Sequence, residues 1–147
     1  MHNFEAANLY CEGSETKFMR EESRWWIEDA KRCLAKAERY LELGFYEDCV
    51  FNCQQALEKL FKGLSIVLLR KRPDKTHNLA KLYKALEKHV ALNEELRDFL
   101  SLISPYYFIT RYPDIAMGLP GEIITKSFAV ECIAKTRRVF DCFQKFI

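Results

Sequence analysis

Residues 46–69, YEDCVFNCQQALEKLFKGLSIVLL, decide the fold class of this chain. Apolar side chains recur along the stretch at spacings of three and four, the period of one face of an α-helix. The apolar stripe is broad, so we expect this helix to be central to the core. Its members are Tyr46, Cys49, Val50, Cys53, Leu57, Leu60, Phe61, Leu64 and Leu68.

Weaker helical periods flank this central stretch on both sides. Short connections between successive helices favour antiparallel neighbours. The sequence therefore predicts an all-α, up-and-down antiparallel bundle of about five helices in one domain, residues 22–147. Residues 1–21 show no clear period and are expected to form an N-terminal tail or an extra turn. The other helices are expected near 22–43, from 76 to about 90, from 93 to a break at Pro105 with an extension over 106–111, and near 125–146.

Several single residues suit the ends of these helices. Gly44 fits the C-terminal cap of the first helix, because glycine adopts the left-handed backbone that such caps use. Thr76 and Asn93 fit N-caps, because their side-chain oxygens can accept a hydrogen bond from a free backbone N–H. Pro73 must lie beyond the end of the central helix, and Pro113 is expected to end the extension over 106–111.

The composition describes one soluble globular domain. Of 147 residues, 49% are hydrophobic, and 23 Lys and Arg against 21 Asp and Glu leave a net charge of only +2. A chain so nearly neutral has no global attraction to nucleic acid or membrane, so an anion site must come from a local patch. No stretch approaches the roughly 20 apolar residues of a membrane span. The N-terminus has no secretory pattern, so we expect a cytoplasmic location without membrane contact.

Six cysteines invite a metal or disulfide interpretation, but their positions favour packing. Four of them fall on apolar stripes of the expected helices, where cysteine behaves as a small hydrophobic residue. None forms a Cys-x-x-Cys pair. We therefore expect core positions, no metal and no cofactor, with metal or redox chemistry as the alternative. The six are Cys11, Cys33, Cys49, Cys53, Cys132 and Cys142.

Three stretches, taken in order, resemble the HEPN domain family. GFYEDCVFNCQQALEKLFKGL at 44–64 is similar to the family's Gln-Gln-Ala-x-Glu-Lys helix, which carries a second lysine further on. PDKTHNL at 73–79 resembles its Pro-x-x-Thr-His-Asp-Leu segment, with Asn78 in place of the usual aspartate. PYYFITRYPD at 105–114 is similar to its Tyr-x-x-x-x-Arg-Tyr-Pro segment. The resemblance covers residues 22–147.

This resemblance implies a small helical bundle, commonly a homodimer, that is associated with nucleotides or RNA. Many members act as partners of a minimal nucleotidyltransferase in systems of toxin–antitoxin type. Other members are metal-independent ribonucleases that carry an Arg-x(4–6)-His motif. The sequence leaves these branches open.

The central helix carries a first group of candidate residues. Gln55, Lys59 and Lys62 are spaced four and seven apart and share a face, while Glu58 can pair with Lys62. As a functional site, this face would offer a lysine to a phosphate. The alternative is a solvated edge or the rim of a dimer interface.

His77 is the second candidate and follows a basic connection that contains Arg70, Arg72 and Lys75. If the next helix starts at Thr76, His77 lies in its first turn, where free N–H groups favour anions. His77 would then contact a phosphate together with Lys75, or simply anchor the connection. Both Arg70 and Arg72 satisfy Arg-x(4–6)-His with His77, the catalytic alternative. The residues that follow these arginines depart from the family's motif, so no catalytic residue is assigned.

The third candidate group lies around the Arg-Tyr-Pro segment. Tyr107 and Tyr112 can stack on a base while Arg111 binds a phosphate. The alternative is a packed aromatic corner in which Arg111 pairs with Asp114 or with a glutamate of the central helix. Three functions thus remain: a dimeric nucleotide- or RNA-phosphate-binding module and nucleotidyltransferase partner, a metal-independent ribonuclease, and a purely structural dimeric domain.

Overall fold

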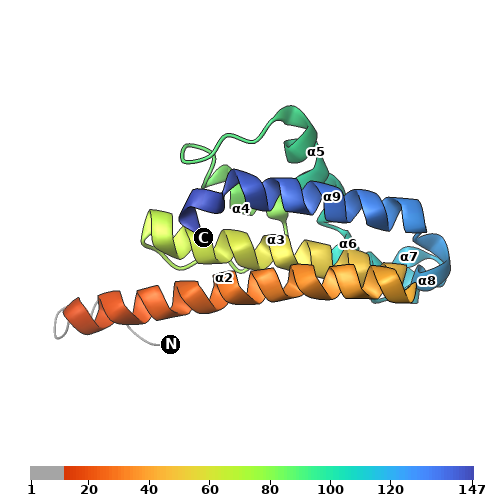
Figure 1. Cartoon of the computed structure of the whole chain (residues 1–147), viewed down its shortest axis with the longest axis horizontal. Coiled ribbons are helices and arrows are strands. Elements are labelled where there is room, and N and C mark those ends of the chain that lie inside the picture. The colour runs from red at the N-terminus through yellow and green to blue at the C-terminus, as the bar shows by residue number, and fades with distance from the viewer. Residues whose placement is uncertain (1–11) are drawn as a thin grey trace.

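A computed structural model describes residues 12–147, with side chains described from Lys17 onward, and these residues form helices without any strand. The all-α prediction is therefore confirmed (Figure 1). The helices of ten or more residues are α2 (Glu12–Leu43), α3 (Tyr46–Leu69), α5 (Glu94–Ile103) and α9 (Lys126–Cys142). The short ones are α4 (Leu79–Lys84), α6 (Tyr106–Ile109), α7 (Pro113–Ala116), α8 (Pro120–Ile123) and the 3-10 helix η1 (Gln144–Phe146).

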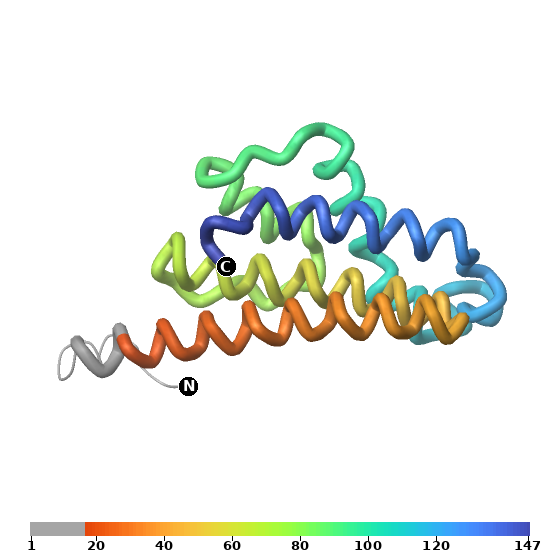
Figure 2. The backbone as a smooth tube through the Cα atoms, in the orientation of Figure 1, coloured from red at the N-terminus to blue at the C-terminus, as the bar shows by residue number. Residues whose placement is uncertain are grey.

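Helices α2 and α3 form a long antiparallel hairpin, and α9 lies along α3 (Figures 1 and 2). Between α3 and α9 the chain returns through α5 and the short helices α4, α6, α7 and α8, so this part of the up-and-down bundle consists of several helices. Helix α2 has 32 residues and α3 has 24 residues. At the rise of an α-helix these lengths correspond to about 48 Å and about 36 Å. The N-terminal end of α2 consequently extends beyond the end of α3 (Figure 1).

Gly44 caps α2 as its sequence predicts. Its φ of +83° is the left-handed conformation that glycine adopts without strain. The N–H of Gly44 donates to the carbonyl of Leu41 at 3.1 Å, and the N–H of Phe45 donates to that of Tyr40 at 2.9 Å. This pair of bonds is the Schellman arrangement. The Tyr40 and Phe45 rings supply its hydrophobic contact with centroids 6.4 Å apart, so the turn between the two longest helices is set locally.

The predicted helix from Thr76 to Val90 is wrong at both ends. The helix begins at Leu79, because the Asn78 side chain accepts the N–H of Lys81, while the Thr76 hydroxyl accepts the N–H of Asn78 in a local turn. It ends at Lys84, and turns follow it. There the Tyr83 hydroxyl donates to the carbonyl of Val90 and accepts the N–H of Leu92, both at 2.7 Å, which holds the chain in a non-helical path.

Two other boundaries differ from the expected ones. Helix α2 begins at Glu12, ten residues before the expected start, so much of the proposed tail is helical; residues 1–11 lie outside the described residues. Pro113 does not end the extension over 106–111, which already ends at Ile109, but starts α7, where its missing N–H is harmless. The bounds predicted for α3 and the Asn93 cap of α5 are confirmed.

The core lies between α2, α3 and α9, closed by α4 and α5. Phe61 is fully buried at its centre and packs against Tyr83 and Phe143 with ring centroids 6.1 and 5.7 Å away. Cys33, Cys49, Cys53 and Cys132 are all buried, which confirms their core positions. Cys142 is exposed, so the core position expected for it is wrong, and Cys11 lies outside the described residues. None of the helices within residues 12–147 is long and apolar enough to cross a membrane.

Candidate functional site

A buried carboxylate on α3 joins the first and second candidate groups. The Glu58 side chain is only 7% exposed and accepts hydrogen bonds from the ammonium of Lys62 at 3.0 Å and from Nδ1 of His77 at 2.8 Å. The amide of Gln54 donates both to Glu58 at 3.2 Å and to the carbonyl of His77 at 3.1 Å. A buried charge needs such partners, so Glu58 fixes the connection between α3 and α4 in place.

His77 lies just before the cap residue of α4, not in the first turn of a helix. The expectation that His77 lies in the first turn of a helix that starts at Thr76 is therefore wrong. Its ring instead stacks on Tyr107 of α6, with centroids 3.6 Å apart and planes 12° from parallel, and meets the edge of Phe108 at 5.9 Å. Because Glu58 occupies Nδ1, the atom left for a ligand or a proton is Nε2.

Arg111 continues this cluster on the other end of α6. Its guanidinium lies 4.6 Å from the ring centroid of Tyr107, 5.2 Å from that of Tyr112 and 5.5 Å from that of Phe51. It also donates to the Tyr112 hydroxyl at 3.1 Å, and its hydrogen bond with Tyr107 raises the pKa of the guanidinium, which keeps its charge. Among the described side chains, no carboxylate pairs with Arg111, so the expected alternative of a bond to Asp114 is not formed.

The lysines of α3 do not act together. Lys62 is nearly buried against Glu58, and its ammonium also lies 5.7 Å from the Trp26 ring. Lys59 points toward α2, where it donates to Asp29 at 2.7 Å and to the thiol of Cys33 at 3.6 Å. Burial opposes the charge of Lys59, but the hydrogen bond to Asp29 and the other contacts outweigh it, so the pKa lies above its ordinary value. Lys59 and Lys62, which were predicted to share a face with Gln55, thus pair with different carboxylates: Lys59 with Asp29 of α2 and Lys62 with Glu58 of α3.

Lys75 and His77 line a shallow groove of about 580 Å³ between the start of α4 and the junction of α5 and α6. Ser104 also lines the groove, and its hydroxyl accepts the N–H of Leu79 at 2.9 Å and donates to the carbonyl of Leu100 at 2.6 Å. Phe108, 44% exposed, forms part of its wall. The groove therefore presents a cation, an imidazole and an exposed ring to one ligand.

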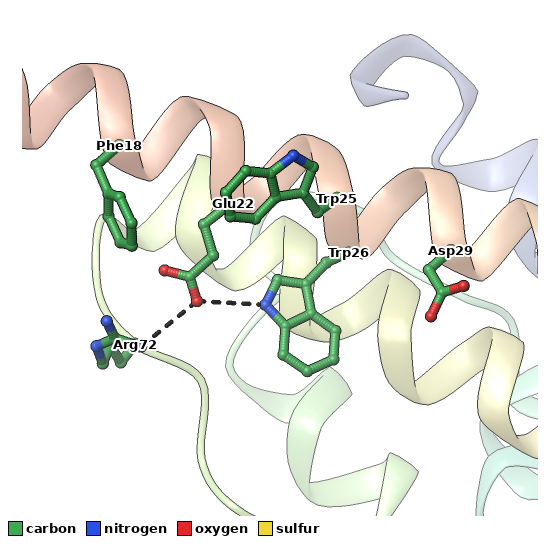
Figure 3. A pocket seen from close by; sticks show the side chains of 6 residues that line it. All are labelled: Phe18, Glu22, Trp25, Trp26, Asp29 and Arg72. Carbon is green, nitrogen blue, oxygen red and sulfur yellow. Dashed lines mark hydrogen bonds and ion pairs between the residues drawn. The ribbon is translucent and has the colours of Figure 1, made fainter.

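The two arginines of the basic connection are not part of this groove. Arg72 donates to Glu22 of α2 at 3.4 Å, and Glu22 also accepts the indole N–H of Trp26 (Figure 3). Arg70 is exposed and turns the chain at the end of α3, with a left-handed φ of 55°. Arg111, by contrast, lies over the same Tyr107 ring on which His77 stacks. Of the three arginines, Arg111 is therefore the one that packs on the stacked rings of His77 and Tyr107.

Sequence reasoning missed Gln54 and Phe51. Gln54 lies four residues before Glu58, just as Lys62 lies four residues after it, so the spacing that pairs Glu58 with Lys62 also places Gln54 beside Glu58. Phe51 has no such signal, because its contact with Tyr107 joins residues far apart in the chain. Within residues 12–147, no cluster of His, Cys, Asp and Glu has the makings of a metal site.

Comparison with known proteins identifies one family. The profile of the HEPN domain matches residues 23–146. The crystal structure of TT1696 from Thermus thermophilus is 30% identical over 86% of this chain and 98% of its own, with a TM-score of 0.75. ST0689, described as an archaeal HEPN homologue, is 27% identical over 82% of this chain and 93% of its own, with a TM-score of 0.66. No curated protein matches the sequence. The chain belongs to the HEPN domain family.

Proposed function

We propose that this HEPN protein is a binding module for nucleotides or RNA, and that it recognises their phosphate through Arg111, His77 and Lys75. One observation carries the proposal: the Arg111 guanidinium is exposed, is held by three aromatic rings and has no carboxylate partner among the described side chains. Arginine so fixed loses little freedom when it binds a phosphate in a bidentate manner. The exposed rings of Phe108 and Tyr112 offer faces on which a base can stack.

The proposal includes a homodimer and a nucleotidyltransferase partner, as the HEPN resemblance implies. Exposed apolar side chains support a protein contact, since they gather on α7, α8 and the segment between them. Ile115, Met117 and Leu119 are 53%, 90% and 58% exposed. Met117 also has a left-handed φ of 57°, a backbone conformation that residues other than glycine seldom adopt. A cytoplasmic location fits the same proposal.

Arg111→Gln is expected to weaken nucleotide or RNA binding by about 10- to 100-fold, because a charge-assisted phosphate contact is lost. Calorimetric titration of wild type and variant with ATP, GTP and a short single-stranded RNA measures the change. Arg137→Gln is the matched control, since Arg137 is an exposed arginine on α9 that pairs with Glu38 of α2. Equal affinities for wild type and Arg111→Gln would contradict the phosphate site.

Sedimentation of the same samples gives the oligomeric state, and a monomer at micromolar concentration would contradict the dimer.

The ribonuclease alternative is favoured by the Glu58–His77 bond. A carboxylate that holds Nδ1 orients an imidazole and leaves Nε2 to take a proton, here from a 2′-hydroxyl. On this alternative Arg111, not Arg70 or Arg72, would stabilise the charged phosphorane, because Arg111 is the arginine that shares Tyr107 with His77.

His77→Ala is expected, on this alternative, to slow the cleavage of single-stranded RNA by about 100-fold or more in the presence of EDTA. Gel analysis of a labelled RNA gives the rate. Circular dichroism of the two proteins separates lost catalysis from lost structure. If the wild-type protein leaves the RNA intact, the ribonuclease alternative fails, and the titrations decide between the binding module and a purely structural domain.

A further inference from the structure

A second groove, of about 410 Å³, runs along the N-terminal half of α2, beside Arg72 of the connection that follows α3 (Figure 3). Three aromatic side chains line it. Phe18 and Trp25 are 44% and 51% exposed and meet edge to face with ring centroids 6.4 Å apart. Trp26 is half-buried beside them, and its indole N–H is directed at Glu22. Large rings that stay this exposed offer faces on which a flat ligand can stack.

Polar groups in this groove suit the edge of a base better than a phosphate. Glu22 and Asp29 place carboxylates beside the rings (Figure 3). Oδ2 of Asp29 accepts a hydrogen bond from Lys59. Because the Asp29 side chain is 46% exposed, its Oδ1 can accept a hydrogen bond from a ligand. Carboxylate oxygens accept the amino and ring N–H groups of bases, whereas they repel a phosphate.

The connection that borders the groove is basic. Residues 70–75 contain four Lys and Arg and one Asp, a net charge of +3, whereas the stretch of α2 that lines the groove, residues 18–29, has two Arg against four Asp and Glu. The exposed side chains of Arg70, Lys71 and Lys75 lie on the connection that passes the groove. The connection thus attracts the phosphates of a strand whose base enters between the rings.

Side-chain contacts link this groove to the Arg111 site. The Lys62 ammonium lies 5.7 Å from the Trp26 ring and 3.0 Å from Glu58, which in turn holds His77 at 2.8 Å against Tyr107. The two sites are therefore joined by a continuous series of side-chain contacts. Single-stranded nucleic acid bound along aromatic and basic side chains occupies about four or more nucleotides.

We infer that the groove of Phe18, Trp25 and Trp26 is a base-stacking subsite for single-stranded RNA, which binds with its phosphates along Arg70–Lys75 and reaches Arg111. This inference rests on the proposed function and adds to it a preference for a strand over a mononucleotide. A ligand with one base and one phosphate contacts the Arg111 site alone, whereas an oligonucleotide gains the second contact.

The test compares binding of an eight-nucleotide single-stranded RNA and of GMP to full-length wild type, Trp25→Ala and Trp25→Tyr. Trp25→Ala is expected to weaken the RNA by about 5- to 100-fold and to leave GMP unchanged, because one stacking contact is lost. Trp25→Tyr, which keeps a ring, should restore most of the affinity. The chain has only two tryptophans, and both line the groove, so quenching of their emission by the RNA reports the contact directly.

Two further variants complete the design. Phe18→Ala repeats the test on the second exposed ring, and Val130→Ala is the control, an exposed apolar residue of α9 outside the groove. Equal RNA affinity of wild type and Trp25→Ala overturns the inference, and so does a change of oligomeric state in Trp25→Ala without loss of RNA affinity, since the rings would then contact protein. If Arg111→Gln weakens the RNA and Trp25→Ala does not, the subsite alone fails. If wild type binds no RNA or nucleotide, the proposed function fails with it.

Discussion

Glu58→Ala is expected to lower the free energy of unfolding by about 3–5 kcal/mol. The substitution removes the carboxylate that holds both Lys62 and His77, and the Lys62 side chain, 11% exposed, is left as a charge without its partner. Gln54 loses a hydrogen-bond acceptor as well. Natural domains of this size unfold with about 5–15 kcal/mol, so this change removes a large fraction of the total. Urea denaturation followed by circular dichroism measures it.

The chain contains its own control for this prediction. Glu131 and Lys135 of α9 form a second Glu–Lys pair with the same spacing of four, but Glu131 is 52% exposed. Glu131→Ala should cost less than about 1 kcal/mol, because the half-exposed Glu131 is in contact with water, which screens its pairing with Lys135. A similar cost for the two substitutions would show that the surroundings of Glu58 do not matter, and would contradict its assignment as the residue that fixes the α3–α4 connection.

Phe61→Ala is expected to cost about 3–5 kcal/mol by leaving a cavity in the middle of the core. Phe61 is fully buried, and Tyr83 and Phe143 pack on it from α4 and from the end of α9, so elements from three parts of the chain lose a common contact. Tyr83 also bonds to Val90 and Leu92, which prevents it from moving freely into the space. The same urea titration measures the loss.

Phe18→Ala is the matched comparison for Phe61, because Phe18 is 44% exposed at the far end of α2. It should change the free energy of unfolding by less than about 1 kcal/mol, since much of its ring is already in contact with water. That result would also show that the Phe18→Ala protein is folded, so a loss of RNA binding by this variant could be attributed to the missing ring. A loss at Phe61 as small as at Phe18 would mean that the core rearranges to fill the site.

The parts of the fold that were predictable from sequence depend on local chemistry. The apolar period of residues 46–69 predicts both ends of α3. The glycine at 44 and the asparagine at 93 cap as expected, because each acts on backbone groups within a few residues. The burial of four cysteines followed from their positions on apolar stripes.

The candidate site was only partly predictable, because its geometry comes from contacts between distant residues. His77 stands before α4 because Gln54 and Glu58 hold it from α3, and because the start of α4 is bonded to Ser104, 25 residues further on. Helical spacing placed Lys62 with Lys59, yet a buried glutamate on one side and Asp29 on the other separate them. Periodicity shows which face a residue shares, but not which neighbour takes its charge.

Because four thiols are buried, the rate at which a thiol reagent modifies them reports the local opening of the bundle. Cys33 lies between α2 and α3, and Cys132 is buried on α9, so a reagent reaches each only when the surrounding helices separate. Burial, the largest cause, raises the pKa of Cys132 to about 12, which makes its thiol still less reactive while the bundle is closed. Cys142 is exposed and should react at once. The slower modification rates would thus time how often each part of the bundle opens, without any engineered probe.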